Sequence, residues 1–170
     1  MCRHLAACDA TRSSRCAISD APAARHWSER LGGLLAGAWA GMLLCVALIA
    51  TRVPFAVLSL AEAGRVATRV LAYEAHASLV IALLLYIIVR RQARASAATG
   101  RGSIVSCNVL LVLGTLFCTV AGYFAVQPMM ETARAGQGAF TFATLHLVSV
   151  LFFGLKTVLV IVLGWRLAAR

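Results

Sequence analysis

The chain has 170 residues, which is enough for one domain. Hydrophobic residues make up 61% of it and charged residues only 13%, whereas soluble domains are nearer half apolar and a quarter charged. This excess excludes an ordinary water-soluble domain and indicates a lipid environment. The net charge of +10 would also suit a nucleic acid, but no basic stripe is interleaved with aromatic residues, so no nucleic-acid partner is expected.

Residues 1–30 are polar and mixed, and they lack periodicity, which predicts a disordered cytoplasmic tail. No apolar stretch precedes a cleavage site, so the segment does not resemble a secretory signal. Three of the six cysteines lie in this tail, at Cys2, Cys8 and Cys16. We expect free thiols there, because the cytoplasm is reducing.

Four apolar runs follow, and each is long enough to cross the bilayer core as a helix, for which about 20 residues suffice. They cover about residues 31–51, 70–89, 104–126 and 142–165. A spanning segment must satisfy its own backbone groups, and the runs are continuously apolar rather than alternating, so they predict helices and not barrel strands. The predicted fold is therefore all-α: an integral membrane four-helix bundle over residues 31–170.

Arginines predict the orientation of the bundle, because positive residues concentrate on the cytoplasmic side of a membrane. One side would carry the arginines of the tail, the second loop and the C-terminus: Arg3, Arg12, Arg15, Arg25, Arg30, Arg90, Arg91, Arg94, Arg101, Arg166 and Arg170. The other side would carry Arg52, Arg65, Arg69 and Arg134. Both ends of the chain are thus predicted to be cytoplasmic, in the inner membrane of a cell.

The first apolar run contains Gly33, Gly37 and Gly41 in the segment GLLAGAWAG. Spacing of four places these glycines on one helix face, where a neighbouring backbone can approach closely. They are the predicted helix-packing residues. The pattern leaves open whether the neighbour is another helix of the same bundle or a second copy in a homodimer.

The loop before the second run, AEAGRVATRV, is predicted to form a short amphipathic helix along the membrane surface. Glu74 and His76 then open the second run. Glu74 would lie at a helix N-terminus, where the dipole favours a negative charge, and its carboxylate can reach Ser78 one turn further on.

The last run carries His146, Ser149 and Lys156, which fall within about 80° of one another on a helix of about 100° per residue. A charged lysine near mid-bilayer costs several kcal/mol, so Lys156 must face the interior, be paired or be neutral. His76, His146, Lys156, Glu74 and Ser149 are the candidate ligand or ion-relay residues. If Lys156 is only structural, Lys156→Met is expected to preserve or raise stability, because a hydrophobe replaces a buried charge.

His76 and His146 are both predicted near the external face, where two histidines could ligate a metal or form an axial pair for haem. Histidines held by hydrogen bonds at the interface are the commoner case. The chain has no CxxC, no HExxH, no phosphate-binding loop and no Ser/His/Asp group, so we expect no enzyme and no cofactor.

The layout resembles the bacterial family called domain of unknown function 4149, which is related to eukaryotic transmembrane protein 205. The resemblance rests on the Gly- and Trp-containing first run, Pro54, the AEAGRVATRV loop, the Arg90–Arg91 pair, Pro128, and the sequence from Phe142 to Ser149 with its LHxxS element. It implies a small inner-membrane protein without an established activity. Lys156 departs from the family, because the resemblance implies a neutral polar or apolar residue there.

Two main hypotheses follow for the function. The first is a structural or accessory bundle that packs in the bilayer with itself or with a larger membrane complex, favoured by the glycine row and the short loops. The second is a small transporter or metal-handling protein that uses the intramembrane His, Lys and Glu residues. A weaker third is a haem-binding electron carrier.

Overall fold

The computed structural model describes residues 27, 30–100, 103 and 105–169, and in these the chain forms helices and no strand. Four helices are long and apolar enough to cross a membrane: Arg30–Val57, Leu60–Ala98, Cys107–Arg134 and Phe142–Ala168. The protein is therefore an all-helical, multi-pass membrane protein, as the composition predicts. Apart from Trp27 and Arg30, the predicted disordered tail lies outside the described residues.

The first spanning helix, Arg30–Val57, is interrupted near its end by a π-helical turn, η1 (Val46–Ala50), and a short helix, α2 (Val53–Val57). Pro54 occupies the first turn of α2, where its missing N–H is tolerated. The second spanning helix is α3 (Leu60–Ala98). The third consists of α4 (Cys107–Thr119), the π-helical segment η2 (Val120–Ala125) and α5 (Val126–Arg134), and the fourth is α6 (Phe142–Ala168).

Helix α3 corrects the prediction for the loop before the second run. It starts at Leu60, where the backbone N–H of Ser59 donates to Glu62 Oε2 at 3.3 Å in a capping box. The AEAGRVATRV segment is thus the beginning of α3 and not a separate surface helix. Glu74 consequently lies well inside α3, so the expected dipole interaction at a helix N-terminus does not apply to it.

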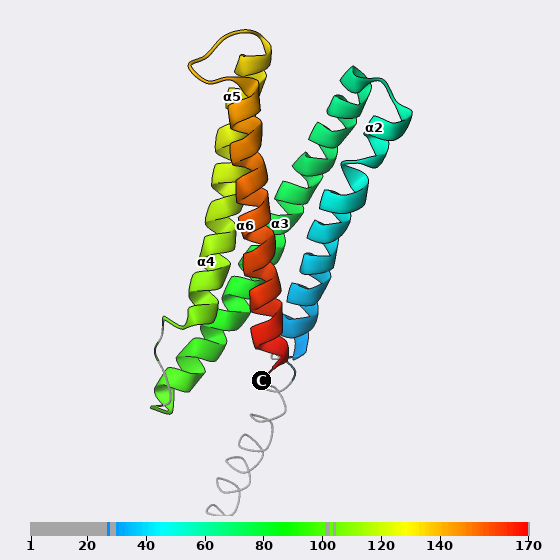
Figure 1. Ribbon diagram of the computed structural model, residues 1–170. Helices are drawn as coiled ribbons and strands as arrows, with labels where there is room; N and C mark the ends of the chain where they lie inside the picture. The colour runs from blue at the N-terminus through cyan, green and yellow to red at the C-terminus, as the bar shows by residue number, and fades with distance from the viewer. Residues whose placement is uncertain (1–26, 28–29, 101–102, 104, 170) are drawn as a thin grey trace, which may run out of the picture.

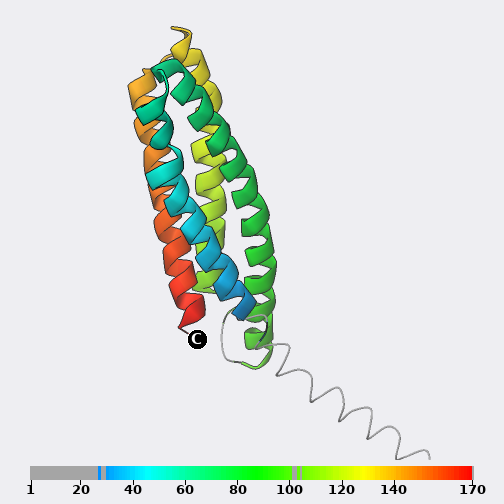
Figure 2. The same cartoon turned by 90° about the vertical axis from the view of Figure 1, so that its right-hand side faces the viewer.

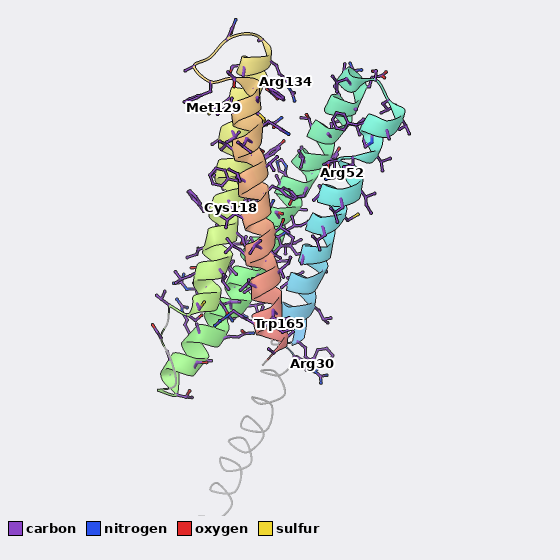
Figure 3. All side chains as sticks on the ribbon, viewed as in Figure 1. Arg30, Arg52, Cys118, Met129, Arg134 and Trp165 are labelled. Atoms are coloured by element: carbon purple, nitrogen blue, oxygen red, sulfur yellow. The ribbon has the colours of Figure 1, made fainter. Side chains whose placement is uncertain are left out.

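Consecutive spanning helices run in opposite directions, so the start of the first spanning helix and the end of α6 lie at the same end of the bundle (Figure 1). Figure 3 shows Arg30 and Trp165 at that end and Arg52, Met129 and Arg134 at the opposite end. We call the first the terminal end and the second the α5 end. The loop between α5 and α6 lies at the α5 end, with glycines at positive φ at Gly136 and Gly138.

The main core lies in the half of the bundle nearer the terminal end and contains residues from all four spanning helices, which Figure 2 shows in a second view. It contains one buried group from each helix: Ala36, Trp39 and Leu43; Ala82, Leu85, Val89 and Ala93; Val109 and Val112; Val160, Leu163 and Leu167. Towards the α5 end, a smaller cluster of Val126, Met130 and Leu145 joins α5 to α6.

The three glycines predicted to pack the first spanning helix have different surroundings. A Cβ on Gly33 would lie 3.8 Å from the backbone of Leu167 and Ala168, so Gly33 does pack against α6. Gly37 and Gly41 are exposed, and a Cβ on either would meet nothing within 4 Å. The close approach is made instead by the neighbouring small residue Ala36, which is fully buried 3.7 Å from the Cβ position of Gly164 in α6.

Candidate functional site

Glu74 and Lys156 form an ion pair in the interior of the bundle. Lys156 Nζ donates to Glu74 Oε1 at 2.8 Å and to Oε2 at 3.0 Å, across 82 residues of sequence. Both residues are almost completely buried, with exposed fractions of 5% for Glu74 and 3% for Lys156. The partner that Lys156 requires is therefore the acid at the start of the second apolar run.

The pair lies near the middle of the membrane-spanning region. Lys156 is fourteen residues from the start of α6 and twelve from its end, which places it about 21 Å and 18 Å from the two ends at 1.5 Å per residue. The hydrocarbon core is about 30 Å thick, so the Lys156 side chain cannot reach a headgroup region simply by extending. Pairing with an opposite charge is what compensates for the loss of water around each of them.

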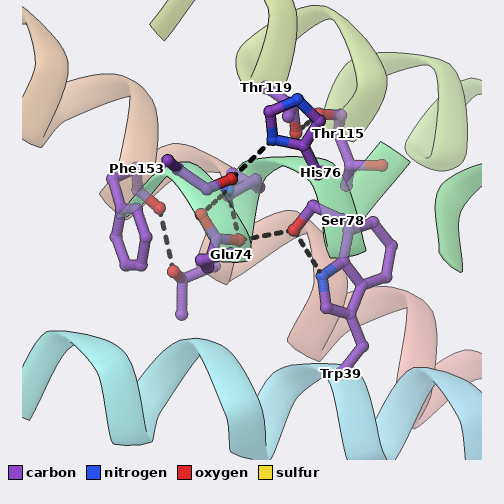
Figure 4. A network of polar contacts seen from close by, with 10 residues as sticks. Trp39, Glu74, His76, Ser78, Thr115, Thr119 and Phe153 are labelled. Carbon is purple, nitrogen blue, oxygen red and sulfur yellow. Dashed lines mark hydrogen bonds and ion pairs between the residues drawn. The ribbon is translucent and has the colours of Figure 1, made fainter. Parts of the chain in front are cut away.

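Two further side chains extend the pair into a network that reaches the first spanning helix (Figure 4). The Ser78 hydroxyl, one turn beyond Glu74 on α3, donates to Glu74 Oε1, as the spacing of the two residues predicts. Trp39 Nε1 donates to Ser78 Oγ at 2.9 Å. Three of the four spanning helices are thus tied together by charged and neutral hydrogen bonds in a low-dielectric interior, where such bonds are strong.

The lysine has an aromatic neighbour on its own helix. Its Nζ lies 4.8 Å from the centroid of the Phe153 ring, within the range of a cation–π contact. The Lys156 ammonium group thus contacts both the Phe153 ring and the Glu74 carboxylate.

A small cavity borders the ion pair and is lined by the third spanning helix. Its volume is about 30 Å³, and its lining residues are Leu71, Glu74, Cys118, Thr119, Gly122, Tyr123, Gln127, Ser149, Phe153 and Lys156. One water molecule needs a volume of about 10–15 Å³ and polar groups to which it can hydrogen-bond. The cavity can therefore hold one or two waters, and it is too small for an organic solute.

The wall of this cavity contains the π-helical segment η2. Gly122 in this segment has no space for a side chain, because a Cβ there would lie 2.7 Å from Phe152 Cβ of α6. The Gly122 carbonyl accepts a hydrogen bond from Ser149 Oγ at 3.4 Å. Single π-helical turns inside α-helices occur frequently at functional sites.

Of the five candidate residues, the structure brings together Glu74, Lys156 and Ser149 at this cavity, and it places the two histidines elsewhere. His76 is exposed, with its Nδ1 2.7 Å from the Ala72 carbonyl oxygen and its ring against Tyr123 and Phe124. His146 is also exposed and stacks on Phe142, which in turn lies beneath the Arg134 guanidinium.

No group of three His, Cys, Asp or Glu side chains suited to a metal ion occurs among the described residues. The tail cysteines Cys2, Cys8 and Cys16 lie outside them. The two histidines have different neighbours, so the structure offers no geometric support for an axial haem pair.

Sequence reasoning missed several residues of the site. Cys118, Thr119, Tyr123 and Gln127 line the cavity, and Trp39 completes the network. One signal was present: Thr115, Thr119, Tyr123 and Gln127 recur every four residues and so share one face of the third helix. Nothing in the sequence distinguishes Trp39 from an ordinary buried tryptophan.

Comparison with known proteins identifies the family. A search of curated proteins and a search of solved structures gave no match. The family model described as domain of unknown function (DUF4149) matches residues 34–139, which include Trp39, Glu74, Ser78 and most of the cavity wall. Ser149 and Lys156 lie beyond the matched residues, as does the LHxxS element. Since the match covers more than half of the chain, this membrane protein belongs to the DUF4149 family.

Proposed function

We propose that the protein is a small inner-membrane protein whose Glu74–Lys156 pair binds and releases protons. The observation that supports this proposal most directly is a buried ion pair near mid-membrane that borders a polar cavity with room for water. Ionisable residues inside membranes are rare and costly, and they commonly mark ion or proton pathways.

Stability alone is a weak reason for such a pair. The desolvation of two charges offsets much of their attraction, and well-packed hydrophobic residues in the same place are often neutral or stabilising. An apolar pair would also be easier to insert into the bilayer. Because desolvation and membrane insertion both disfavour the pair, we infer that its charges serve the function of the protein.

The size and lining of the cavity favour protons over larger cargo. About 30 Å³ accommodates one or two waters and excludes amino acids, sugars and organic ions. Of the lining hydroxyls, Tyr123 can donate to water and accept from it, whereas Thr119 and Ser149 donate to the Thr115 and Gly122 carbonyls and can accept from water.

The chemical step that we propose is the protonation of Glu74. A hydronium ion in the cavity transfers a proton to the Glu74 carboxylate, which gives a neutral carboxylic acid and one water. The site changes from zero net charge to +1, and the remaining charge is the Lys156 ammonium. The other titratable groups facing the cavity are Cys118 and Tyr123, both from the third spanning helix.

The orientation is also part of the proposal. Arg30 lies at the terminal end and Arg52 and Arg134 lie towards the α5 end (Figure 3). Along α3, Arg65 and Arg69 lie in the part that starts at the α5 end and Arg90, Arg91 and Arg94 in the part that finishes at the terminal end, where Arg166 lies in the last turn of α6. Together with the arginines of the tail, this distribution supports a cytoplasmic terminal end and an inner-membrane location. The proposed function is not enzymatic.

A second candidate is an accessory bundle that supports a partner or a larger membrane complex. The observation that favours it is the completeness of the network: Glu74 has partners on both oxygens and Ser78 has a partner on either side. Such a network can specify how three helices pack without any proton transfer, as buried polar groups do in some coiled coils.

Proton flux in vesicles separates the two candidates. The wild-type chain, reconstituted in liposomes that enclose a pH-sensitive dye, is expected to conduct protons when a potassium gradient and valinomycin impose a voltage. The double variant E74Q/K156M removes both charges and keeps the approximate volumes. We expect its flux to fall to that of protein-free vesicles, while its circular dichroism and elution volume stay at the wild-type values.

Two controls make the result specific. Glu62→Gln removes an exposed acid that does not line the cavity and should leave the flux unchanged, because glutamine also serves in the capping box with Ser59. The charge-reversed variant E74K/K156E keeps an ion pair. Its flux shows whether proton transfer requires the carboxylate on α3 and the ammonium group on α6. A folded E74Q/K156M protein with wild-type flux would refute the relay, as would wild-type vesicles that conduct no better than empty ones; the second result would leave the accessory bundle as the better explanation.

A further inference from the structure

We infer that the Glu74–Lys156 pair is open to water from the α5 end of the bundle and closed from the terminal end. This inference deepens the proposed function, on which it rests in part, by assigning the side of the membrane from which protons arrive. The inference rests on two features: a row of cavity-lining residues that extends towards the α5 end, and a layer of apolar side chains towards the terminal end.

The access path follows the lining of the cavity. On α6 the lining extends from Lys156 to Ser149, seven residues or about 10 Å towards the α5 end. On the third spanning helix it extends from Cys118 to Gln127 in the same direction. Tyr123, Gln127 and Ser149 are partly exposed, unlike the ion pair itself.

The path ends close to the polar boundary of the molecule. Glu131 lies one helical turn beyond Gln127 and is exposed, and on α3 the exposed Arg69 lies two residues before the lining residue Leu71. Charged residues at these positions mark where the helices leave the hydrocarbon region. On α3 the nearest charged residue at this end, Arg69, is thus five residues or about 8 Å from Glu74, whereas Arg90 at the other end is sixteen residues or about 24 Å away.

The opposite direction is closed by apolar side chains. The next turns of each helix towards the terminal end contribute Ala36, Leu85, Val112, Val160 and Leu163, which are at most 1% exposed. They belong to one continuous core cluster. The first charged residue beyond this layer on α6 is Arg166, ten residues or about 15 Å from Lys156.

The hydroxyls near this layer do not extend the path. Thr115 donates to the Val112 carbonyl at 2.7 Å, and Thr157 donates to the Phe153 carbonyl at 2.8 Å. Each hydroxyl proton is thus held by the backbone of its own helix. Beyond them, the buried Asn108 accepts a hydrogen bond from Arg166 Nε at 2.9 Å, but the apolar side chains of Val112, Val160 and Leu163 belong to the core between that contact and the ion pair. We infer that a proton on Glu74 continues to the terminal end only after a change of conformation.

Silver-ion accessibility tests the direction of access, because Ag⁺ is a small soft cation that binds thiols and can follow water into a narrow cavity. The reporter is Cys118, kept as the sole cysteine after the other five are replaced by Ser or Ala. Right-side-out and inside-out vesicles in nitrate buffer are treated with Ag⁺ from one side, quenched and denatured. Free thiols are then labelled with a maleimide that shifts the band on a gel.

Three reporters in a background without native cysteines complete the design. Gln137→Cys in the loop between α5 and α6 identifies which side faces the reagent. Ser149→Cys is a second cavity reporter, and Val160→Cys is the matched reporter in the apolar layer. We expect Ag⁺ on the Gln137 side to remove most of the maleimide label from Cys118 and Ser149→Cys, whereas Ag⁺ on the other side should leave both labels intact.

Val160→Cys should keep its label under either treatment. Equal loss of label from both sides, loss only from the terminal end, or no loss at Cys118 and Ser149→Cys would overturn the inference. The result is independent of the flux measurement. One-sided access without proton flux would keep the path and refute the relay, whereas flux without one-sided access would keep the relay and refute the path.

Discussion

Trp39 Nε1 donates a hydrogen bond to Ser78 Oγ at 2.9 Å, and this contact places the first spanning helix in the same network as the Glu74–Lys156 pair. Both residues are buried, with Trp39 1% exposed and Ser78 fully enclosed. Ser78 accepts from the indole and donates to the carboxylate, so one hydroxyl links a neutral donor to a charged acceptor. A substitution of Ser78 therefore removes both hydrogen bonds at once and tests the network directly.

We predict that Ser78→Ala destabilises the protein by about 1–3 kcal/mol, because it leaves the Trp39 N–H buried without an acceptor and removes a donor from Glu74. The measurement is the midpoint of unfolding when detergent-solubilised protein is titrated with sodium dodecyl sulfate. Ser96→Ala, near the end of the same helix, is the control and should leave the midpoint unchanged. An unchanged midpoint for Ser78→Ala would show that the network contributes nothing to stability.

The ion pair reverses an expectation drawn from the sequence. From the sequence, Lys156→Met is expected to preserve or raise stability if Lys156 is only structural, but the structure gives Lys156 a buried partner. We predict that the single variant loses about 3–5 kcal/mol, because the Glu74 carboxylate remains buried without a counter-charge. The double variant E74Q/K156M should recover most of this loss. The same denaturant titration measures both, and a single variant as stable as the double one would contradict the prediction.

The contact between η2 and α6 depends on a glycine. We predict that Gly122→Ala lowers stability by about 1–3 kcal/mol, the usual cost of overpacking, because the added Cβ would lie 2.7 Å from Phe152 Cβ. Gly154→Ala on α6 is the matched control, since a Cβ there meets nothing within 4 Å. Thermal unfolding in detergent, followed by circular dichroism, compares the two. Equal melting temperatures for both variants would refute the close approach at Gly122.

The first spanning helix provides a second pair of glycine variants. We predict that Gly37→Leu leaves the melting temperature of the monomer unchanged, because Gly37 faces open space, while Gly164→Leu lowers it by forcing Ala36 away from α6. Size-exclusion chromatography with light scattering gives the oligomeric state of each variant. A smaller oligomer for Gly37→Leu than for the wild type would support the homodimer interface that the glycine row leaves open. A loss of melting temperature in Gly37→Leu without a change of oligomer would contradict the packing described above.

Much of the fold could be predicted from the sequence, because the hydrophobic effect and the backbone hydrogen-bond requirement act on contiguous residues. Continuous apolar runs of about twenty residues have few structural alternatives to membrane-spanning helices. The start of α3 was also readable in principle, from Ser59 and Glu62 at capping-box spacing. That local signal was outweighed by the arginines of the AEAGRVATRV segment.

The candidate site was only partly predictable. Lys156 was identifiable by the cost of its charge in lipid, and Glu74 by its place beside an apolar run. That they pair, and that the histidines stand apart from them, depends on the rotation and crossing of α3 against α6. Hydropathy does not specify these angles, because every face of such a helix is apolar enough for lipid.

The sequence by itself determined that this chain spans a membrane four times as helices and that Lys156 in the last helix must face the interior, be paired or be neutral. The tertiary structure alone decided that Glu74 pairs with Lys156 and that Ser78 and Trp39 extend the network. It also decided that Gly33 and Ala36 pack against α6, while a Cβ on Gly37 or Gly41 would meet nothing within 4 Å. The physical reason is range: helix formation and membrane insertion depend on local composition, whereas a contact across 82 residues depends on how side chains pack when the helices meet.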